Sequence, residues 1–269
     1  MLKNGRVAPQ DKPVTMPVSQ MTLALVLRTR PFGESDKIVS FLTQDLGKIT
    51  GIAKGAKRSR RRFMNSLEPF SLVNLHFQDH PNRSLAFIVA AELLVGFKQL
   101  VTNLVKISYA SYMVEITEGL IAEREENHLV FKHLRDGLSY LEENEPSLRF
   151  LTSFELILLR LTGYQPFLDS CKRCGNDCHR TAARWHVSFS DGGILCDSCA
   201  HTIKQTFLYS AAAVEVLKGL QAGHNSVMFP RLLPASVISE IRSLSMQFIQ
   251  YHMDREIKSA PFLYQFALV

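Results

Sequence analysis

Apolar residues in the first third of the chain recur at every second position, which is the pattern of short β-strands. The segment 22–29 shows it most clearly, because its apolar side chains divide between the two faces of an extended chain: Leu23, Leu25 and Leu27 against Ala24 and Val26. Four more such segments follow, each bounded by turn residues: 36–43, 48–53, 70–77 and 85–94. No helical segment long enough for a parallel crossover separates them, so the five strands are predicted to form a small antiparallel barrel.

Beyond residue 96 the apolar period becomes helical. Segments 131–141 and 237–251 carry apolar stripes spaced three and four residues apart, 100–123 reads as a long helix, and 150–161 is apolar on nearly every side. The sequence therefore predicts an α+β protein, a five-stranded antiparallel oligonucleotide-binding (OB) barrel followed by an all-α domain. The predicted divisions are a flexible extension at 1–20, the barrel at 21–97, and the helical domain at 98–269 with a cysteine-rich insert at 168–202.

Charge is concentrated at one end of the chain. The net charge is +6, but residues 1–70 hold 13 Lys and Arg against 5 Asp and Glu, whereas the remainder holds 18 against 20. This asymmetry favours a polyanionic partner for the N-terminal part. The N-terminus lacks the apolar core of a secretory signal, and no apolar run approaches the roughly 18–20 residues of a membrane span, so we expect a cytoplasmic protein.

The densest charge lies directly after the third predicted strand, where six of the nine residues from 54 to 62 are basic. Mutual repulsion argues against burying all of them, so we expect a solvated loop that meets a phosphate backbone. The predicted contacts are Lys54, Lys57, Arg58, Arg60, Arg61 and Arg62. Phe63, His76 and Phe77 are the nearest candidates for stacking on bases, although a place in the barrel core is the favoured interpretation for each aromatic.

Two C-x-x-C pairs, separated by 21 residues, predict a metal site: Cys171 with Cys174 and Cys196 with Cys199. Each pair directs two thiolates at one point, and together they complete the tetrahedron of a structural zinc ribbon with one Zn²⁺ per chain. Other possible ligands lie nearby and could replace a member of these pairs: Cys178, His179, His186 and His201. Gly175 suits the tight turn after the first pair.

Signals for catalysis are weak. The sequence contains no H-E-x-x-H or G-x-S-x-G motif, and the segment 51–57 lacks the Ser or Thr that follows the lysine of a phosphate-binding P-loop. The glutamates near 123–126 and 142–145 are expected to be solvated side chains at helix ends. We therefore expect a protein that is not an enzyme.

Two stretches carry a resemblance to a known family. Residues 24–43 read A-L-V-L-R-T-R-P-F-G-E-S-D-K-I-V-S-F-L-T, and residues 47–63 read G-K-I-T-G-I-A-K-G-A-K-R-S-R-R-R-F. With a helical domain that bears two C-x-x-C pairs, the chain resembles the bacterial recombination mediator family RecO over about residues 20–255. The G-E-S-D turn and the basic run are the most specific parts.

The resemblance implies an OB barrel, a zinc-bearing helical domain and a non-enzymatic role in recombinational repair, in association with the nucleoid. Members bind single- and double-stranded DNA, anneal complementary strands, associate with RecR, and help RecA to replace single-strand binding protein (SSB). The resemblance places DNA contacts on the six basic residues of 54–62 and the metal on the four paired cysteines.

Two other functions also fit the residues. An RNA-binding module of translation or ribosome assembly could combine an OB barrel with a zinc ribbon, because a basic loop does not distinguish ribose from deoxyribose. A metal-dependent nucleic-acid enzyme would need an open coordination position, with Cys178 or His186 as an essential residue.

Overall fold

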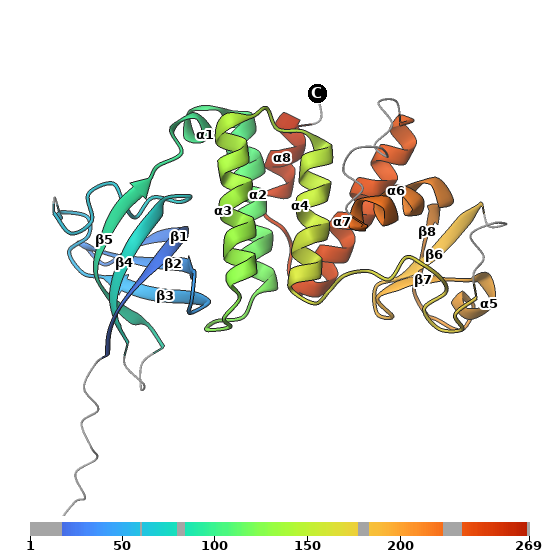
Figure 1. Cartoon of the computed structure of the whole chain (residues 1–269), viewed down its shortest axis with the longest axis horizontal. Coiled ribbons are helices and arrows are strands. Elements are labelled where there is room, and N and C mark those ends of the chain that lie inside the picture. The colour runs from blue at the N-terminus through green and yellow to red at the C-terminus, as the bar shows by residue number, and fades with distance from the viewer. Residues whose placement is uncertain (1–17, 60, 80–83, 177–182, 223–232, 268–269) are drawn as a thin grey trace, which may run out of the picture.

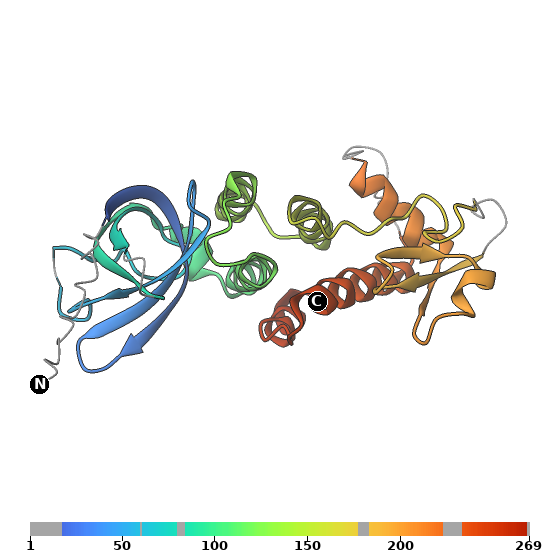
Figure 2. The same ribbon diagram turned by 90° about the horizontal axis from the view of Figure 1, so that it is seen from below.

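The computed structural model describes residues 18–59, 61–79, 84–176, 183–222 and 233–267. Three parts follow one another along the molecule: a closed barrel at one end, helices in the middle, and a small sheet at the other end (Figures 1 and 2). Among these residues, no helix combines the length and the apolar character that crossing a membrane requires.

The barrel confirms the predicted fold of the N-terminal part. Its strands are β1 (Val18–Phe32), β2 (Asp36–Thr43), β3 (Lys48–Ala53), β4 (Leu72–Asp79) and β5 (Ala86–Val95), joined in the order β1-β2-β3-β5-β4. Four pairings are antiparallel, and the pairing of β3 with β5 is parallel. A ring with an odd number of strands cannot alternate direction all the way round, so closing five strands requires one parallel pair.

β1 is longer than the sequence indicates and enters the predicted extension 1–20. It begins at Val18, which pairs with Asp79 at the end of β4, so ladder hydrogen bonds to β4 hold this added length of β1 in the barrel. In the middle of β1, at 24–27, apolar side chains on both faces are buried. Ala24 and Val26 belong to the barrel core, while Leu25 and Leu27 join the core of the helices.

The helices are α1 (Lys98–Thr102), α2 (Leu104–Leu120), α3 (His128–Glu143), α4 (Leu148–Leu161), α5 (Asp197–Ala200), α6 (Ala211–Gln221), α7 (Ala235–Met253) and α8 (Ala260–Ala267). The predicted single helix over 100–123 is wrong, because the chain breaks at Asn103. The side chain of Asn103 accepts hydrogen bonds from the backbone N–H groups of Val105 and Lys106, which caps a new helix there.

α2 joins the barrel to the helices. It packs against β1 and against α3, α4, α7 and α8. Arg28 of β1 forms an ion pair with Glu118 of α2 at 2.7 Å. The Lys48 ammonium donates to the carbonyl oxygens of Glu118 and Ile121 at 3.0 and 2.9 Å, where α2 ends and its carbonyls lack partners within the helix. Barrel and helices are therefore joined by both apolar and polar contacts.

The cysteine-rich segment forms a sheet, as a ribbon-like insert should. Its strands are β6 (Arg184–Ser188), β7 (Gly193–Leu195) and β8 (Phe207–Ser210), in the order β7-β6-β8. β8 lies after the predicted insert 168–202, and the only tryptophan of the chain, Trp185, is buried opposite Tyr209 of β8. The sheet therefore joins the helical core through β6 and β8.

Candidate functional site

The basic loop, residues 54–62, follows β3 at the end of the barrel. The side chains of Lys54, Lys57, Arg58, Arg61 and Arg62 are exposed, and Arg60 lies outside the described residues. Within the described part of the chain, no carboxylate lies within the 4.0 Å of an ion pair with any of these five cations. No ion pair among the described residues therefore neutralises this charge, although Asp36 lies close enough to Lys54 and Lys57 for their charges to interact.

The G-E-S-D turn between β1 and β2 holds the start of the basic loop. The Asp36 carboxylate accepts a hydrogen bond from the Gly55 backbone N–H at 2.8 Å, and the Ser35 carbonyl accepts one from the Lys57 N–H at 2.9 Å. The Lys57 ammonium donates to the Gly33 carbonyl at 2.8 Å. The pKa of Asp36 is lowered, first by the hydrogen bond from the Gly55 backbone N–H and then by one from the Ser35 side-chain hydroxyl. The two most specific motifs of the sequence thus bind one another.

We expect Asp36→Ala to loosen the first turn of the basic loop, because the Gly55 N–H loses its acceptor. Trypsin should then cleave within residues 54–62 several-fold faster than in the wild type, since cleavage needs an unfolded loop. Asp36→Asn keeps an acceptor oxygen and should stay close to the wild-type rate, as should Glu34→Ala in the same turn. Equal cleavage of Asp36→Ala and wild type would remove this role from Asp36.

The far end of the basic loop is anchored in the barrel core. Phe63 and Leu67 are buried there, and the Arg62 carbonyl accepts a hydrogen bond from the Ala91 N–H of β5 at 2.9 Å. Phe77 is also fully buried, so neither phenylalanine presents a face to a base, which confirms the core interpretation. His76 is half-buried and lies 2.7 Å from the Ser19 hydroxyl. None of the three aromatic candidates from the sequence is therefore an exposed ring on which a base could stack.

The structure brings the four predicted cysteines together at the far end of the molecule from the basic loop (Figure 1). Their sulfur atoms all lie within 4.8 Å of one another, and Cys174 Sγ is 3.7 Å from Cys196 Sγ. Four thiolates around one Zn²⁺ at about 2.3 Å would be about 3.8 Å apart, so the arrangement is consistent with a zinc site. Cys171 is buried and Cys174 is exposed.

The thiol pKa values differ sharply within the cluster. Burial opposes ionisation of Cys171, but hydrogen bonds from the backbone N–H groups of Cys174, Cys196 and Arg173 outweigh it and lower the pKa to about 6. A hydrogen bond with Cys196, followed by desolvation, raises the pKa of Cys199 to about 12. The protein therefore favours the thiolate of Cys171 and opposes that of Cys199, and a bound cation would offset the cost of ionising Cys199.

Neighbouring residues fix the two cysteine turns. Gly175 has a positive φ of 73° and donates its N–H to the Cys171 carbonyl, which confirms its role in the first turn. Arg173 donates to Asp191 at 2.7 Å and to the Thr202 hydroxyl at 3.0 Å, so the first turn is tied to both the β6–β7 turn and the segment after α5.

Of the other possible ligands, the two that lie in the described part of the chain, His186 and His201, do not join the cluster. His186 Nε2 lies 3.2 Å from Asp197, and its Nδ1 lies 3.1 Å from the Thr206 hydroxyl. His201 is exposed at the end of α5. Cys178 and His179 lie outside the described residues.

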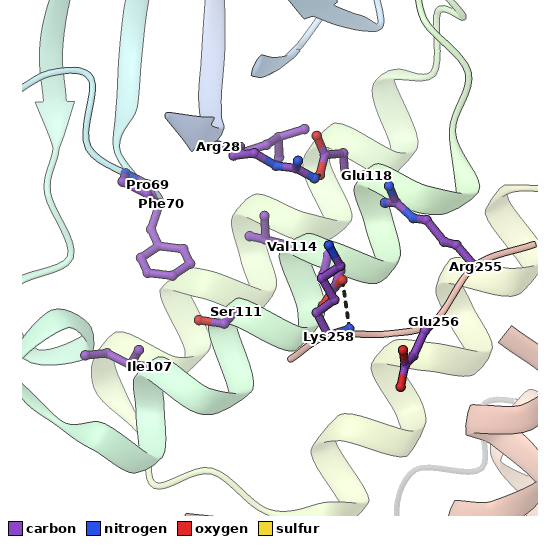
Figure 3. Close-up of a pocket in the computed structure, with 12 residues that line it drawn as sticks. Arg28, Pro69, Phe70, Ile107, Ser111, Val114, Glu118, Arg255, Glu256 and Lys258 are labelled. Atoms are coloured by element: carbon purple, nitrogen blue, oxygen red, sulfur yellow. Dashed lines mark hydrogen bonds and ion pairs between the residues drawn. The ribbon is translucent and has the colours of Figure 1, made fainter. Parts of the chain in front are cut away.

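A cleft of about 710 Å³ lies between the barrel and the helices (Figure 3). The ion pair of Arg28 and Glu118 forms part of its lining, and Phe70 extends from the barrel toward α2. Glu115 accepts hydrogen bonds from the backbone N–H groups of Lys258 and Ser259 at 3.0 and 2.7 Å, which holds the start of α8. The polar groups that line the cleft thus form contacts that hold the barrel and the helices together. The sequence does not predict this cleft, because its residues come from distant segments.

One glutamate expected at the solvated surface has a structural role instead. Glu142 accepts hydrogen bonds from the backbone N–H groups of Gln99 and Leu100, at 3.0 and 2.8 Å. These groups open α1 and have no acceptor within it. Glu142 therefore caps α1 from α3, and the surface prediction for this residue is wrong.

Comparison with known proteins gives one result for both halves of the chain. Residues 18–97 match the family "Recombination protein O N terminal", and residues 101–261 match "Recombination protein O C terminal". Curated relatives named DNA repair protein RecO include that of Anaeromyxobacter dehalogenans (strain 2CP-C), 32% identical over 89% of this chain and 93% of its own. That of Myxococcus xanthus (strain DK1622) is 32% identical over 91% and 97%. The chain therefore belongs to the RecO family of DNA repair proteins.

Proposed function

We propose that this chain is a non-enzymatic DNA-binding mediator of recombinational repair. It binds single- and double-stranded DNA through the basic loop and holds complementary strands together while they anneal. Neutralising the phosphates of two strands removes the repulsion that keeps them apart, so base pairing starts without a chemical step.

The exposed basic loop carries this proposal. Five exposed cations that form no ion pair within the described residues, at the end of a small barrel, match the electrostatic footprint of a nucleic-acid site. If all six predicted cations each met one phosphate of a single strand, affinity would fall about 300-fold between 50 and 200 mM salt. Membership of a DNA repair family supports DNA as the polyanion.

We propose Zn²⁺ as the ion of the cysteine cluster, held by Cys171, Cys174, Cys196 and Cys199. Four thiolates fill a tetrahedral coordination sphere and leave no position for a substrate or a reactive water, so the ion stabilises the fold. The cluster also lies at the opposite end of the molecule from the basic loop (Figure 2).

The proposed partners follow from the family resemblance. They are RecR, SSB and, through replacement of SSB on single-stranded gaps, RecA. In this proposal the chain brings DNA that SSB already covers into contact with a complementary strand, inside the cytoplasm and at the nucleoid.

The decisive experiment is annealing of complementary strands coated with SSB. We expect the variant in which Arg58, Arg60, Arg61 and Arg62 are all changed to Ala to lose annealing and to bind single strands roughly 600-fold more weakly at 100 mM salt. The slope of log affinity against log salt should flatten by about 3, since four phosphate contacts at about 0.7 each are removed. Thermal unfolding should stay close to wild type, because the described side chains of this set are exposed.

A matched control removes four exposed cations from the helical part: Lys98, Lys204, Arg255 and Lys258, all to Ala. It changes the net charge equally and should keep the salt slope of the wild type. Normal annealing by the basic-loop variant would place the DNA site elsewhere. A clear preference for single-stranded RNA over DNA of the same sequence would favour the RNA-binding alternative.

A further inference from the structure

Phe32, the last residue of β1, is an exposed aromatic side chain beside the basic loop. Half of its surface, 50%, is accessible, and it belongs to neither apolar core among the described residues. The two phenylalanines that the sequence offers as stacking candidates, Phe63 and Phe77, are only 5% and 0% exposed. Phe32 therefore offers the ring face that those residues cannot.

The strand register places Phe32 on the side of the basic loop. Phe32 pairs directly with Asp36 across the β1–β2 hairpin. Directly paired residues have Cβ atoms about 4.5–5.5 Å apart and project on the same side of the sheet. The Asp36 carboxylate reaches the backbone N–H of Gly55, the second residue of the basic loop, at 2.8 Å. The side chain of Phe32 thus leaves β1 on the side on which the loop begins.

Cations lie on both sides of this position. The Lys57 ammonium donates to the carbonyl of Gly33, the residue next to Phe32, at 2.8 Å. Arg30, two residues before Phe32, is exposed and shares its strand face, because side chains alternate along a strand. The geometry combines positive groups for phosphates with one flat apolar ring, which are the two components of single-strand binding sites.

We infer that Phe32 stacks on a base of single-stranded DNA whose backbone is held by the basic loop. The inference rests on the proposed function and adds to it a preference for unpaired DNA. Bases in a duplex are already stacked on their neighbours, so only a single strand gains from the ring. Removing one such contact typically weakens single-strand binding about 5- to 150-fold.

The test compares Phe32→Ala with wild type on an oligothymidylate and on a blunt duplex, by fluorescence anisotropy at several salt concentrations. We expect single-strand affinity to fall about 5- to 150-fold, duplex affinity to change less than about twofold, and the salt slope to stay unchanged, because no cation is removed. Tyr251→Ala is the matched control, since Tyr251 is equally exposed, at 51%, but lies on α7.

A second variant reports the contact directly. Phe32→Trp should bind single strands at least as well as wild type, and its fluorescence should be quenched by the oligonucleotide. The signal is readable because the chain has one natural tryptophan, Trp185, which is 1% exposed in β6. Retained affinity in Phe32→Trp also shows that the effect of Phe32→Ala is not a folding defect.

Two results would overturn the inference: wild-type single-strand binding by Phe32→Ala, or equal weakening on single strands and duplex, which would make Phe32 a support for the loop. The four-arginine variant, measured in parallel, separates the two proposals. If it weakens binding while Phe32→Ala does not, only the stacking role fails. If the four-arginine variant also binds DNA as the wild type does, the basic loop is not the DNA-binding site.

Discussion

If the cysteine cluster holds Zn²⁺ as proposed, replacing Cys196 with serine is expected to release the ion and to unfold the cysteine-rich turns. The small core around the cluster contains only three buried residues among those described, Cys171, Leu195 and Ala200. So little apolar surface cannot offset the entropy of ordering the turns. Binding of structural zinc contributes roughly 10–16 kcal/mol in comparable small sites, so its loss removes the main stabilising term of this segment.

Trp185 makes the effect measurable, because this single tryptophan is buried in β6 of the adjoining sheet. Metal analysis should give one zinc per wild-type chain and far less in Cys196→Ser. The tryptophan emission of the variant should shift to the red as the sheet opens. DNA binding by the barrel should persist, since the basic loop and the barrel core are separate from the cluster.

The thiol pKa values also determine how the metal responds to pH. Zn²⁺ binds thiolates, and the pKa of Cys199 in the metal-free cluster is raised to about 12, so binding at neutral pH displaces a proton from this thiol. Protons therefore compete with the metal, and affinity should fall as the pH drops, roughly tenfold per pH unit for each proton released. A chelator should remove zinc more readily at pH 6 than at pH 8.

Cys178→Ser is the control, because Cys178, the fifth cysteine of the chain, lies outside the described residues, and the four cysteines that the described structure brings together do not need it to complete a tetrahedron. It should keep one zinc and the wild-type emission. Loss of metal in Cys178→Ser, or full retention in Cys196→Ser, would contradict the ligand set and would favour an open site of the catalytic kind.

Local patterns gave the reliable part of the sequence prediction. Strand alternation located β2 and β3 at their observed bounds, and the two C-x-x-C pairs located the cluster, because each pattern depends on neighbouring residues. A run of cations predicted an exposed loop for a similarly local reason, since like charges cannot be buried together. These parts required no knowledge of which segments meet in space.

Contacts between distant segments were not predictable in this way. The parallel pairing of β3 with β5 follows from closure of the whole ring, and the third strand of the small sheet comes from Phe207–Ser210, outside the cysteine-rich segment. Glu142 caps a helix more than 40 residues earlier in the chain. The signal for Phe32 is likewise spatial, because its position beside the loop depends on the β1–β2 register.

An isolated acidic residue in an otherwise apolar helix indicates a buried charge that needs a partner. The sequence contains this signal at Glu155. Glu155 lies in the middle of α4 and is fully buried. Its carboxylate accepts a hydrogen bond from the Tyr112 hydroxyl at 2.6 Å and pairs with the guanidinium of Arg242 at 2.5 Å, whose side chain is 5% exposed. The nearby carboxylate raises the pKa of Arg242 against the opposing effect of burial. This group links α2, α4 and α7.

Glu155→Ala is expected to destabilise the protein by about 3–5 kcal/mol, because it leaves the charge of Arg242 buried without a counter-ion. Two nitrogens of Arg242, Nε and Nη2, already have no hydrogen-bond partner among the described residues, so no other group replaces the lost carboxylate. Since domains are stable by only about 5–15 kcal/mol, urea denaturation should show a large fall in the midpoint.

The double variant Glu155→Met, Arg242→Met separates the cost of an unpaired charge from the value of the pair. Buried ion pairs often contribute little relative to apolar residues of similar volume, so we expect the double variant to be considerably more stable than Glu155→Ala. Lys132→Ala breaks an exposed pair with Asp136 at 2.9 Å and should cost at most about 1 kcal/mol. If Glu155→Ala cost no more than Lys132→Ala, the buried pair could not be what fixes α4 against α7.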